Sequence, residues 1–176
     1  MQTKTTINPI TSAAMRVSAK CTVGVSDMRL GKTRGDVIVT HALGSCIGIA
    51  IHDAQACVGG ILHYMLPFSS VDENKASSNP YMFGDTGIPQ LFMHAYKLGA
   101  TKENLRVVMA GGAQVFEKQD FFDIGNRNII IARKAFWKNN IMIAAEHVGG
   151  HLPRTLYLEI GTGRTWFTTH GESTEL

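Results

Sequence analysis

A β-hairpin is predicted by residues 46–63, which read CIGIAIHDAQACVGGILH. Residues 47–52 alternate isoleucines with small or polar residues, as a strand with one apolar face does. Residues 53–56 supply a four-residue turn, and residues 57–63 return as the second strand. The segment therefore indicates a fold that is built around antiparallel strands.

The register of this hairpin decides which side chains meet. If His52 faces Cys57 across the turn, then Cys46 lies opposite His63. Directly opposed residues have Cβ atoms about 4.5–5.5 Å apart on the same face, so we expect the thiol and the imidazole to meet. The rest of that face is small, which is expected to leave room for a substrate: Gly48, Ala50 and Gly59.

The opposite face of the hairpin is expected to form a core layer. It carries large apolar side chains: Ile47, Ile49, Ile51, Val58 and Leu62. A slip of one residue in the pairing would turn every side chain to the other face. The core layer and the pairing of Cys46 with His63 therefore depend on the same register.

Cys46 and His63 are the candidate nucleophile and base. A thiol needs a nearby base to become a thiolate at neutral pH, and histidine is the usual one. Thr40 ends a compact β-branched strand, residues 37–40, and can hydrogen-bond to the imidazole without adding a charge. Each residue also has a plain structural interpretation, as a packed cysteine, a core histidine and a strand threonine.

Outside the hairpin, apolar periodicity predicts two helices and several more strands. One helix begins at Asp85 or Thr86 and ends before Gly99, and the other covers residues 126–138. The second helix is expected to bury Ile129, Ile130, Phe136, Trp137 and the stem of Arg133. Strands are expected at residues 105–110, 141–145, 155–160 and 164–169, and loops at residues 27–35 and 68–80. We therefore expect a layered α/β or α+β domain, in which two helices cover a mostly antiparallel sheet.

Length and composition are typical of a single globular domain. The chain has 176 residues, of which 44% are hydrophobic and 18% charged, and its formal net charge is +3. This charge is too small for the basic surface that nucleic acid binding requires. Residues 1–20, rich in Thr, Ser and Lys, are interpreted as a flexible extension, and residues 21–176 as one domain. No apolar run approaches 18 residues, so insertion into a membrane is not expected.

The cysteines and histidines favour neither disulfides nor a metal site. The cysteines are few and lack CxxC spacing: Cys21, Cys46 and Cys57. Because the sequence shows no secretion signal, a reducing cytoplasm is the expected compartment. Three histidines recur at a spacing that is no metal-ligand motif: His41, His52 and His63. The glycine pairs 111–112 and 149–150 match no phosphate loop and are interpreted as turns or close backbone approaches, so we expect no metal and no cofactor.

A set of motifs spans most of residues 23–165. In order they are Thr40 with Leu43-Gly44-Ser45-Cys46, Gly59-Gly60-x-x-His63, Met65-Leu66-Pro67, Tyr81, Gly99-Ala100, Gly111-Gly112-Ala113, Ile124-Gly125-x-Arg127-Asn128, Gly149-Gly150-x-x-x-Arg154 and Thr162-Gly163. In this combination the chain resembles the CheD family of chemoreceptor glutamine deamidases. The pair His41-Ala42 departs from the family, which usually has apolar or glycine residues between the threonine and the Gly-Ser-Cys motif.

The resemblance implies a layered α/β fold related to cysteine-dependent deamidating toxins, and it puts the family's catalytic residues on Cys46, His63 and Thr40. The implied reaction converts selected glutamines on the cytoplasmic helices of methyl-accepting chemotaxis receptors into glutamates, and it releases ammonia through a thioester. Backbone amides near Gly44 and Ser45 are expected to stabilise the oxyanion. A CheC-type phosphatase is a further partner that the resemblance implies.

Two other functions compete with deamidation. One is a binding module that regulates a phosphatase or a receptor without catalysis. The other is a cysteine peptidase or transglutaminase, which would cleave a peptide bond or join an amine to the substrate.

Overall fold

The structure is a computed structural model, and it describes residues 19–114 and 123–176. The extension predicted for residues 1–20 therefore lies almost wholly outside the described residues. The strands are β1 Lys20–Val23, β2 Asp27–Gly31, β3 Val37–Leu43, β4 Ile47–Asp53, β5 Val58–Tyr64, β6 Leu105–Gly111, β7 Ile143–Val148, β8 Arg154–Glu159, β9 Thr165–Thr169 and β10 Glu172–Glu175. The helices are α1 Glu73–Ser78, α2 Gly84–Lys97 and α3 Ile124–Lys138, with short 3₁₀ turns at Ser69–Val71, Pro80–Met82 and Lys102–Asn104.

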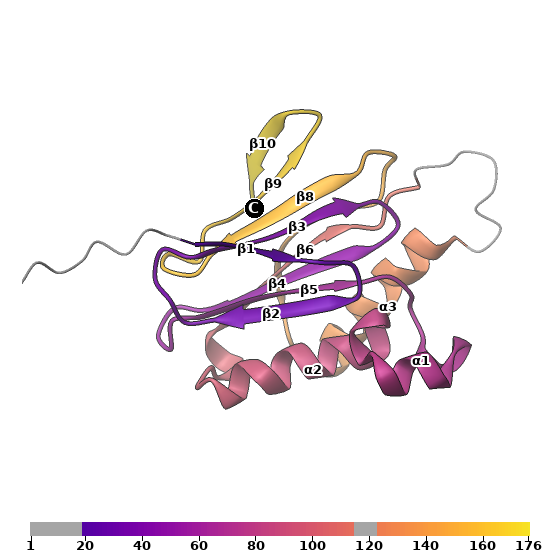
Figure 1. The fold of residues 1–176 in the computed structure, drawn as a ribbon, viewed down its shortest axis with the longest axis horizontal. Coiled ribbons are helices and arrows are strands. Elements are labelled where there is room, and N and C mark those ends of the chain that lie inside the picture. The colour runs from indigo at the N-terminus through magenta and orange to yellow at the C-terminus, as the bar shows by residue number, and fades with distance from the viewer. Residues whose placement is uncertain (1–18, 115–122) are drawn as a thin grey trace, which may run out of the picture.

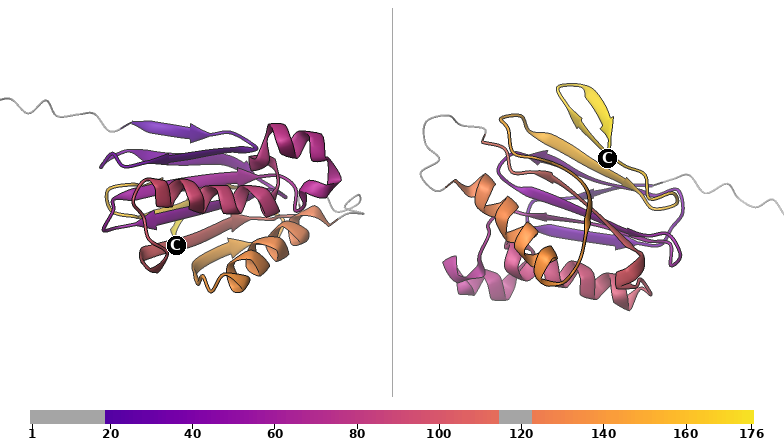
Figure 2. Two further views of the ribbon diagram at one scale, coloured as in Figure 1. Left: turned by 90° about the horizontal axis from the view of Figure 1, so that it is seen from below. Right: turned by 180° about the vertical axis from the view of Figure 1, so that it is seen from behind.

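The strands form two five-stranded sheets that are stacked on each other (Figure 1). The inner sheet has the order β2-β5-β4-β6-β7, and α2 and α3 cover its other face side by side (Figure 2). The outer sheet has the order β1-β3-β8-β9-β10. Most strand pairs are antiparallel, and the parallel pairs within the described residues are β1 with β3 and β6 with β7. The predicted layered fold with two covering helices and mostly antiparallel strands is confirmed.

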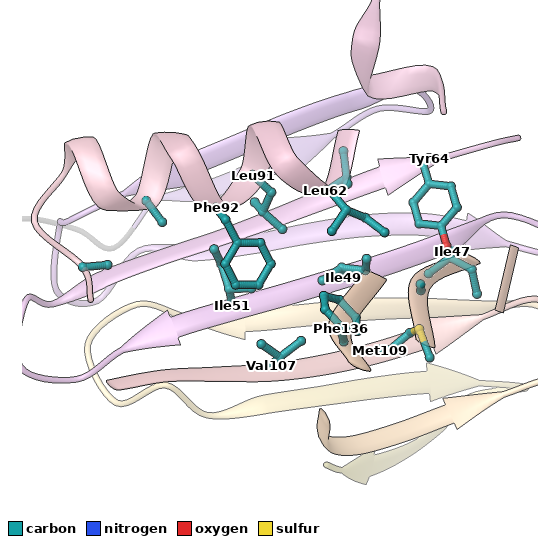
Figure 3. Close-up of a cluster of buried hydrophobic side chains, with 14 of the residues drawn as sticks. Ile47, Ile49, Ile51, Leu62, Tyr64, Leu91, Phe92, Val107, Met109 and Phe136 are labelled. Carbon is teal, nitrogen blue, oxygen red and sulfur yellow. The ribbon is translucent and has the colours of Figure 1, made fainter. Parts of the chain in front are cut away.

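The core between the inner sheet and the helices contains the apolar face that the hairpin pattern predicted. Leu62 points at α2, where Leu91 and Phe92 lie, and Ile49 lies beside Phe136 of α3 (Figure 3). All the predicted members of this layer are almost fully buried: Ile47, Ile49, Ile51, Val58 and Leu62. Burying a side chain of this size stabilises a fold by about 1.5–3 kcal/mol, so this face holds the helices on the sheet.

The small face of the hairpin packs against the outer sheet, and this corrects the expectation that it leaves room for a substrate. A Cβ added at Gly48 would lie 2.9 Å from Leu43 Cδ1 and 3.1 Å from Leu156 Cδ2. A Cβ at Gly59 would lie 3.2 Å from side-chain carbons of Leu158 and Ile160. These positions are glycines because side chains packed on the outer sheet already fill the space that a larger residue would need.

The hairpin register differs from the predicted one by two residues. Gly48 pairs with His63 and Asp53 pairs with Val58, so the turn covers residues 54–57. The cause is the buried carboxylate of Asp53, which accepts hydrogen bonds from the amides of Gln55 and Ala56, both at 2.9 Å. Aspartate commonly closes turns in this way, and here it is the last residue of the strand. A shift of two keeps every side chain on its predicted face, so the core layer is unaffected.

Several other sequence predictions need correction. Residues 27–31, expected in a loop, form edge strand β2 against β5, and the predicted loop 68–80 contains α1. Helix α2 begins at Gly84 without a side-chain cap, because Asp85 instead accepts hydrogen bonds from Ser69. In α3, Ile130 and Trp137 are 41% and 82% exposed. They lie seven residues apart on one face, which points away from the sheet that Ile129 and Phe136 contact.

Candidate active site

Thr40 and His63 come from different sheets and meet in the space between them. Thr40 lies on β3 and His63 on β5, both are fully buried, and Thr40 Oγ1 lies 2.7 Å from His63 Nδ1. The same hydroxyl donates a hydrogen bond of 3.0 Å to the carbonyl oxygen of Val23. A hydroxyl has one proton to donate, so His63 Nδ1–H must be the donor to Thr40. The lone pair of the imidazole is therefore on Nε2, which is buried and has no hydrogen-bond partner among the described residues.

Cys46 lies in the short connection between β3 and β4, just before the first paired residue of β4. Its carbonyl oxygen accepts a hydrogen bond of 2.8 Å from the amide of Gly112, and the Gly44 carbonyl accepts one of 2.7 Å from Ala113. Because Gly48 pairs with His63, Cys46 is two residues beyond that pair at the same end of the hairpin. Within the described part of the chain, no hydrogen bond joins the thiol to the imidazole. Cys46 and His63 are therefore not directly opposite each other, as the predicted register had it, but diagonal neighbours two residues apart along the hairpin.

Burial keeps both groups neutral. Burial raises the pKa of the Cys46 thiol, although the amide of Cys46 itself lowers it in part. Burial lowers the pKa of His63 from 6.5 to about 4. At pH 7 the site therefore holds a thiol and a neutral imidazole instead of a preformed ion pair. Such a pair suits general-base catalysis, in which the proton leaves the thiol as the sulfur attacks.

The backbone amides beside Cys46 differ in what they bond to. The amide of Gly44 donates a hydrogen bond of 2.9 Å to the Ala42 carbonyl. Among the described residues, no carbonyl accepts a hydrogen bond from the amides of Ser45 or Cys46. Two neighbouring amides of this kind are suitable donors to an oxyanion that forms at the sulfur.

A β-bulge at His41 and Ala42 separates Thr40 from the cysteine connection. Thr40 pairs with Leu156 and Leu43 pairs with Arg154, so β3 has one more residue than β8 in this interval. Ala42 adopts a left-handed conformation with φ of 57°, as one residue of a bulge often does. The bulge keeps both Thr40 and Leu43 buried between the sheets. His41 is exposed, and its Nδ1 lies 3.4 Å from Thr155 Oγ1, so the residue that departs from the family pattern lies in the bulge.

Comparison with known proteins identifies the family of this chain. The family described as "CheD chemotactic sensory transduction" matches residues 65–169, more than half of the chain. The chain belongs to the CheD family. The resemblance stated from the sequence motifs is thereby confirmed.

Curated relatives of this CheD-family chain cover almost its whole length. A Syntrophus aciditrophicus protein, named as a probable chemoreceptor glutamine deamidase CheD 1, is 51% identical over 85% of this chain and 93% of its own. A Solibacter usitatus relative, named as a probable chemoreceptor glutamine deamidase CheD, is 49% identical over 88% and 91%. A Clostridium botulinum protein of the same name is 39% identical over 87% and 94%. Alignments of this length span the region of Thr40, Cys46 and His63 wherever they begin.

The other two histidines of the eleven-residue series lie apart from His63. His41 is exposed at the bulge, and His52 Nε2 lies 2.9 Å from the carbonyl oxygen of Ile160, near the turn end of the hairpin. Within residues 19–114 and 123–176, no three His, Cys, Asp or Glu side chains converge as metal ligands. No helix in these ranges is long and apolar enough to span a membrane.

Two residues outside the predicted site support it in the structure. Gly111 has φ of 115°, and a Cβ there would lie 2.2 Å from the Cys46 carbonyl oxygen, so only glycine lets this loop support the cysteine. Arg154 is buried and donates to His147 Nδ1 and to the carbonyl of Gly149, both at 2.7 Å. The close backbone approach predicted for the glycine pair 111–112 is therefore confirmed. For Arg154, the motif Gly149-Gly150-x-x-x-Arg154 was the signal in the sequence that could have pointed to it.

Proposed function

We propose that this chain is a protein-glutamine deamidase that converts glutamines of chemoreceptors into glutamates and releases ammonia. The names of its relatives specify this substrate and this reaction. The observation that carries the proposal is the hydrogen bond between Thr40 and His63, which leaves Nε2 as a free base at the end of the hairpin where Cys46 lies. The reaction requires no metal and no organic cofactor.

The first half of the proposed reaction is attack on the carboxamide. His63 Nε2 takes the proton of Cys46 as the sulfur adds to the side-chain carbonyl carbon of a glutamine. The amides of Ser45 and Cys46, next to Gly44, donate to the oxygen as it becomes an oxyanion. Burial favours the neutral thiol and imidazole in the resting site, so charge separates only once the sulfur attacks.

The second half releases ammonia and then the acid. Protonated His63 gives its proton to the departing nitrogen, which leaves a thioester on Cys46. The same imidazole then takes a proton from water as the water attacks the thioester, and glutamate is released. Thr40 holds the imidazole in one tautomer throughout, since its oxygen accepts from Nδ1–H. This is the orienting role of the third residue in a catalytic triad.

The cytoplasmic helices of methyl-accepting chemotaxis receptors are the proposed substrate, and the cytoplasm is the proposed compartment. The cysteines of the described residues are free, which fits a reducing environment. A CheC-type phosphatase is a second proposed partner, which follows from family membership alone.

Mass spectrometry of a receptor cytoplasmic fragment tests the proposed function. Incubation with this protein should add about one dalton per converted glutamine, as an amide becomes an acid, and should release an equal amount of ammonia. Cys46→Ala should abolish both signals, and His63→Ala should lower the rate by about 100-fold or more. Cys57→Ser is the matched control and should act like the wild type.

The same experiment separates the alternatives. Peptide-bond cleavage, or incorporation of an added amine, would identify a peptidase or a transglutaminase. A receptor of unchanged mass that still binds the protein would identify a non-catalytic binding module.

A further inference from the structure

Asn128 is a fully buried polar residue on α3 that contacts both strand ends of the site. Its side-chain Nδ2 donates a hydrogen bond of 3.0 Å to the carbonyl oxygen of Ser45 and one of 2.9 Å to that of Met65. Ser45 directly precedes Cys46, and Met65 follows His63 by two residues. One amide group therefore connects the segment of the nucleophile to the segment of the base.

These two acceptors require a side chain that donates two hydrogen bonds. Both partners are carbonyl oxygens, so the group between them must donate twice, which an asparagine NH₂ does and an ionised aspartate or a leucine does not. Asn128 Oδ1, on the opposite side, is buried without a hydrogen-bond partner among the described residues. An unsatisfied buried acceptor of this kind usually costs about 1–3 kcal/mol. The fold therefore tolerates the cost of the unsatisfied Oδ1, while Nδ2 donates to both carbonyl oxygens.

Asn128 is itself held firmly in place. The hydroxyl of Tyr64 donates a hydrogen bond of 2.6 Å to the backbone carbonyl oxygen of Asn128, and Tyr64 is the last residue of β5 (Figure 3). One turn earlier in α3, a Cβ at Gly125 would lie 2.6 Å from the Gly112 carbonyl oxygen, so the helix and the loop behind Cys46 are in close contact. The position of the amide is thus fixed by both the sheet and the loop.

The pairing of β4 with β5 does not fix the position of Cys46. The ladder between β4 and β5 begins at Ile47 and Tyr64, so Cys46 lies just outside it. Its connection is held from one side by the Gly112 amide and from the other by Asn128. We propose that Asn128 is a positioning residue, which sets the distance between the Cys46 thiol and His63 Nε2 by holding Ser45 and Met65 together. For its role in catalysis this inference rests on the proposed function, but the coupling of thiol and imidazole is measurable without a receptor.

Alkylation of Cys46 by iodoacetamide, followed by site-resolved mass spectrometry, tests the proposal in the whole protein. The rate is measured from pH 5.5 to 9, with the exposed Cys21 as an internal reference. In the wild type, Cys46 should react faster near pH 7 than in His63→Ala, because the imidazole assists proton removal. Asn128→Leu should lower the Cys46 rate by about tenfold, to the level of His63→Ala. The double variant should react no more slowly than His63→Ala alone, since both changes remove one coupling.

Two further variants keep the proposal falsifiable if Asn128→Leu does not fold. Asn128→Ser retains one donor and should give an intermediate rate, whereas Asn126→Leu, an exposed site in the same helical turn, should match the wild type. Thermal melts of each variant separate loss of fold from loss of coupling. With a receptor fragment, Asn128→Ser should lower kcat and change KM by less than about threefold.

The outcomes distinguish the two proposals. If Asn128 variants melt at lower temperature but keep the wild-type pH profile of Cys46, the residue is merely structural and the inference is overturned. If wild-type Cys46 reacts no faster than in His63→Ala, the mechanism under the proposed function fails as well. If the coupling exists and depends on Asn128 while receptor glutamines stay unchanged, the positioning role stands and deamidation does not.

Discussion

His63 should make the stability of the folded protein depend on pH in a window that its burial defines. The imidazole lies between the two sheets without exposure, and burial lowers its pKa to about 4. In the unfolded chain the same group has its ordinary pKa near 6.5. Above pH 6.5 it is neutral in both states and has no effect on the free energy of unfolding.

Below pH 6.5 the unfolded chain binds a proton that the folded chain does not. The free energy of unfolding must then fall as the pH falls, until the folded form also binds its proton near pH 4. Each pKa unit corresponds to about 1.4 kcal/mol. The difference between 6.5 and about 4 therefore predicts a loss of roughly 3 kcal/mol from this one residue, a large part of the total for a domain of this size.

Urea denaturation at intervals from pH 7 to pH 4, followed by circular dichroism, measures this loss. Carboxylates such as Asp53 also titrate at the lower end, since burial would raise the pKa of Asp53 but hydrogen bonds from backbone amides lower it overall. The comparison is therefore made with His63→Gln, in which the carboxylates are unchanged. The two pH profiles should diverge by about 3 kcal/mol between pH 6.5 and pH 4. Parallel profiles, or an NMR titration of His63 with a pKa near 6.5, would refute the reasoning.

Three further predictions concern single side chains. Thr40→Val keeps the shape of the residue but removes the acceptor for the imidazole Nδ1–H, so kcat of deamidation should fall about 10–100-fold while ¹⁵N NMR shows mixed tautomers. Gly163 has φ of 74°, and a Cβ there would lie 2.3 Å from His52 Nδ1, so Gly163→Ala should lower the free energy of unfolding, measured in urea, by about 2–4 kcal/mol. The control is Gly171→Ala, where φ is 82° but nothing lies within 4 Å of the added Cβ; this change should cost only about 1 kcal/mol. Trp137→Gln should change the urea midpoint little, by less than about 0.5 kcal/mol, because the indole is 82% exposed; a larger loss would show that this residue packs.

The hairpin shows how far local pattern reaches. Alternation along a strand assigns each residue to one of two faces, so the buried layer around Ile49 and Leu62 was predicted correctly. Register is a different quantity, because it depends on which residue closes the turn. Asp53 closes it with the help of the Thr101 amide, which lies 2.9 Å from its carboxylate and 48 residues away in the sequence. Local pattern does not contain that contact.

The helix α3 shows a second limit. Its apolar residues were recognised, but they cover more of its circumference than one buried stripe, and the period alone did not say which side faces the sheet. Ile129 and Phe136 are buried, whereas Trp137 is almost fully exposed. Which face of α3 is buried was decided by its packing against α2 and the inner sheet.

By itself, the sequence determined the layered class of the fold, the two faces of the central hairpin, and, through its motifs, the choice of Cys46, His63 and Thr40 as candidates. Those features follow from short-range periodicity and from residue types at recognisable spacings. Only the tertiary structure decided how the candidates meet. Thr40 reaches His63 because two sheets stack, and Asn128 joins Ser45 to Met65 from a helix that follows more than 60 residues later. Contacts over such distances are set by the packing of whole layers, which depends on all the side chains between them at once.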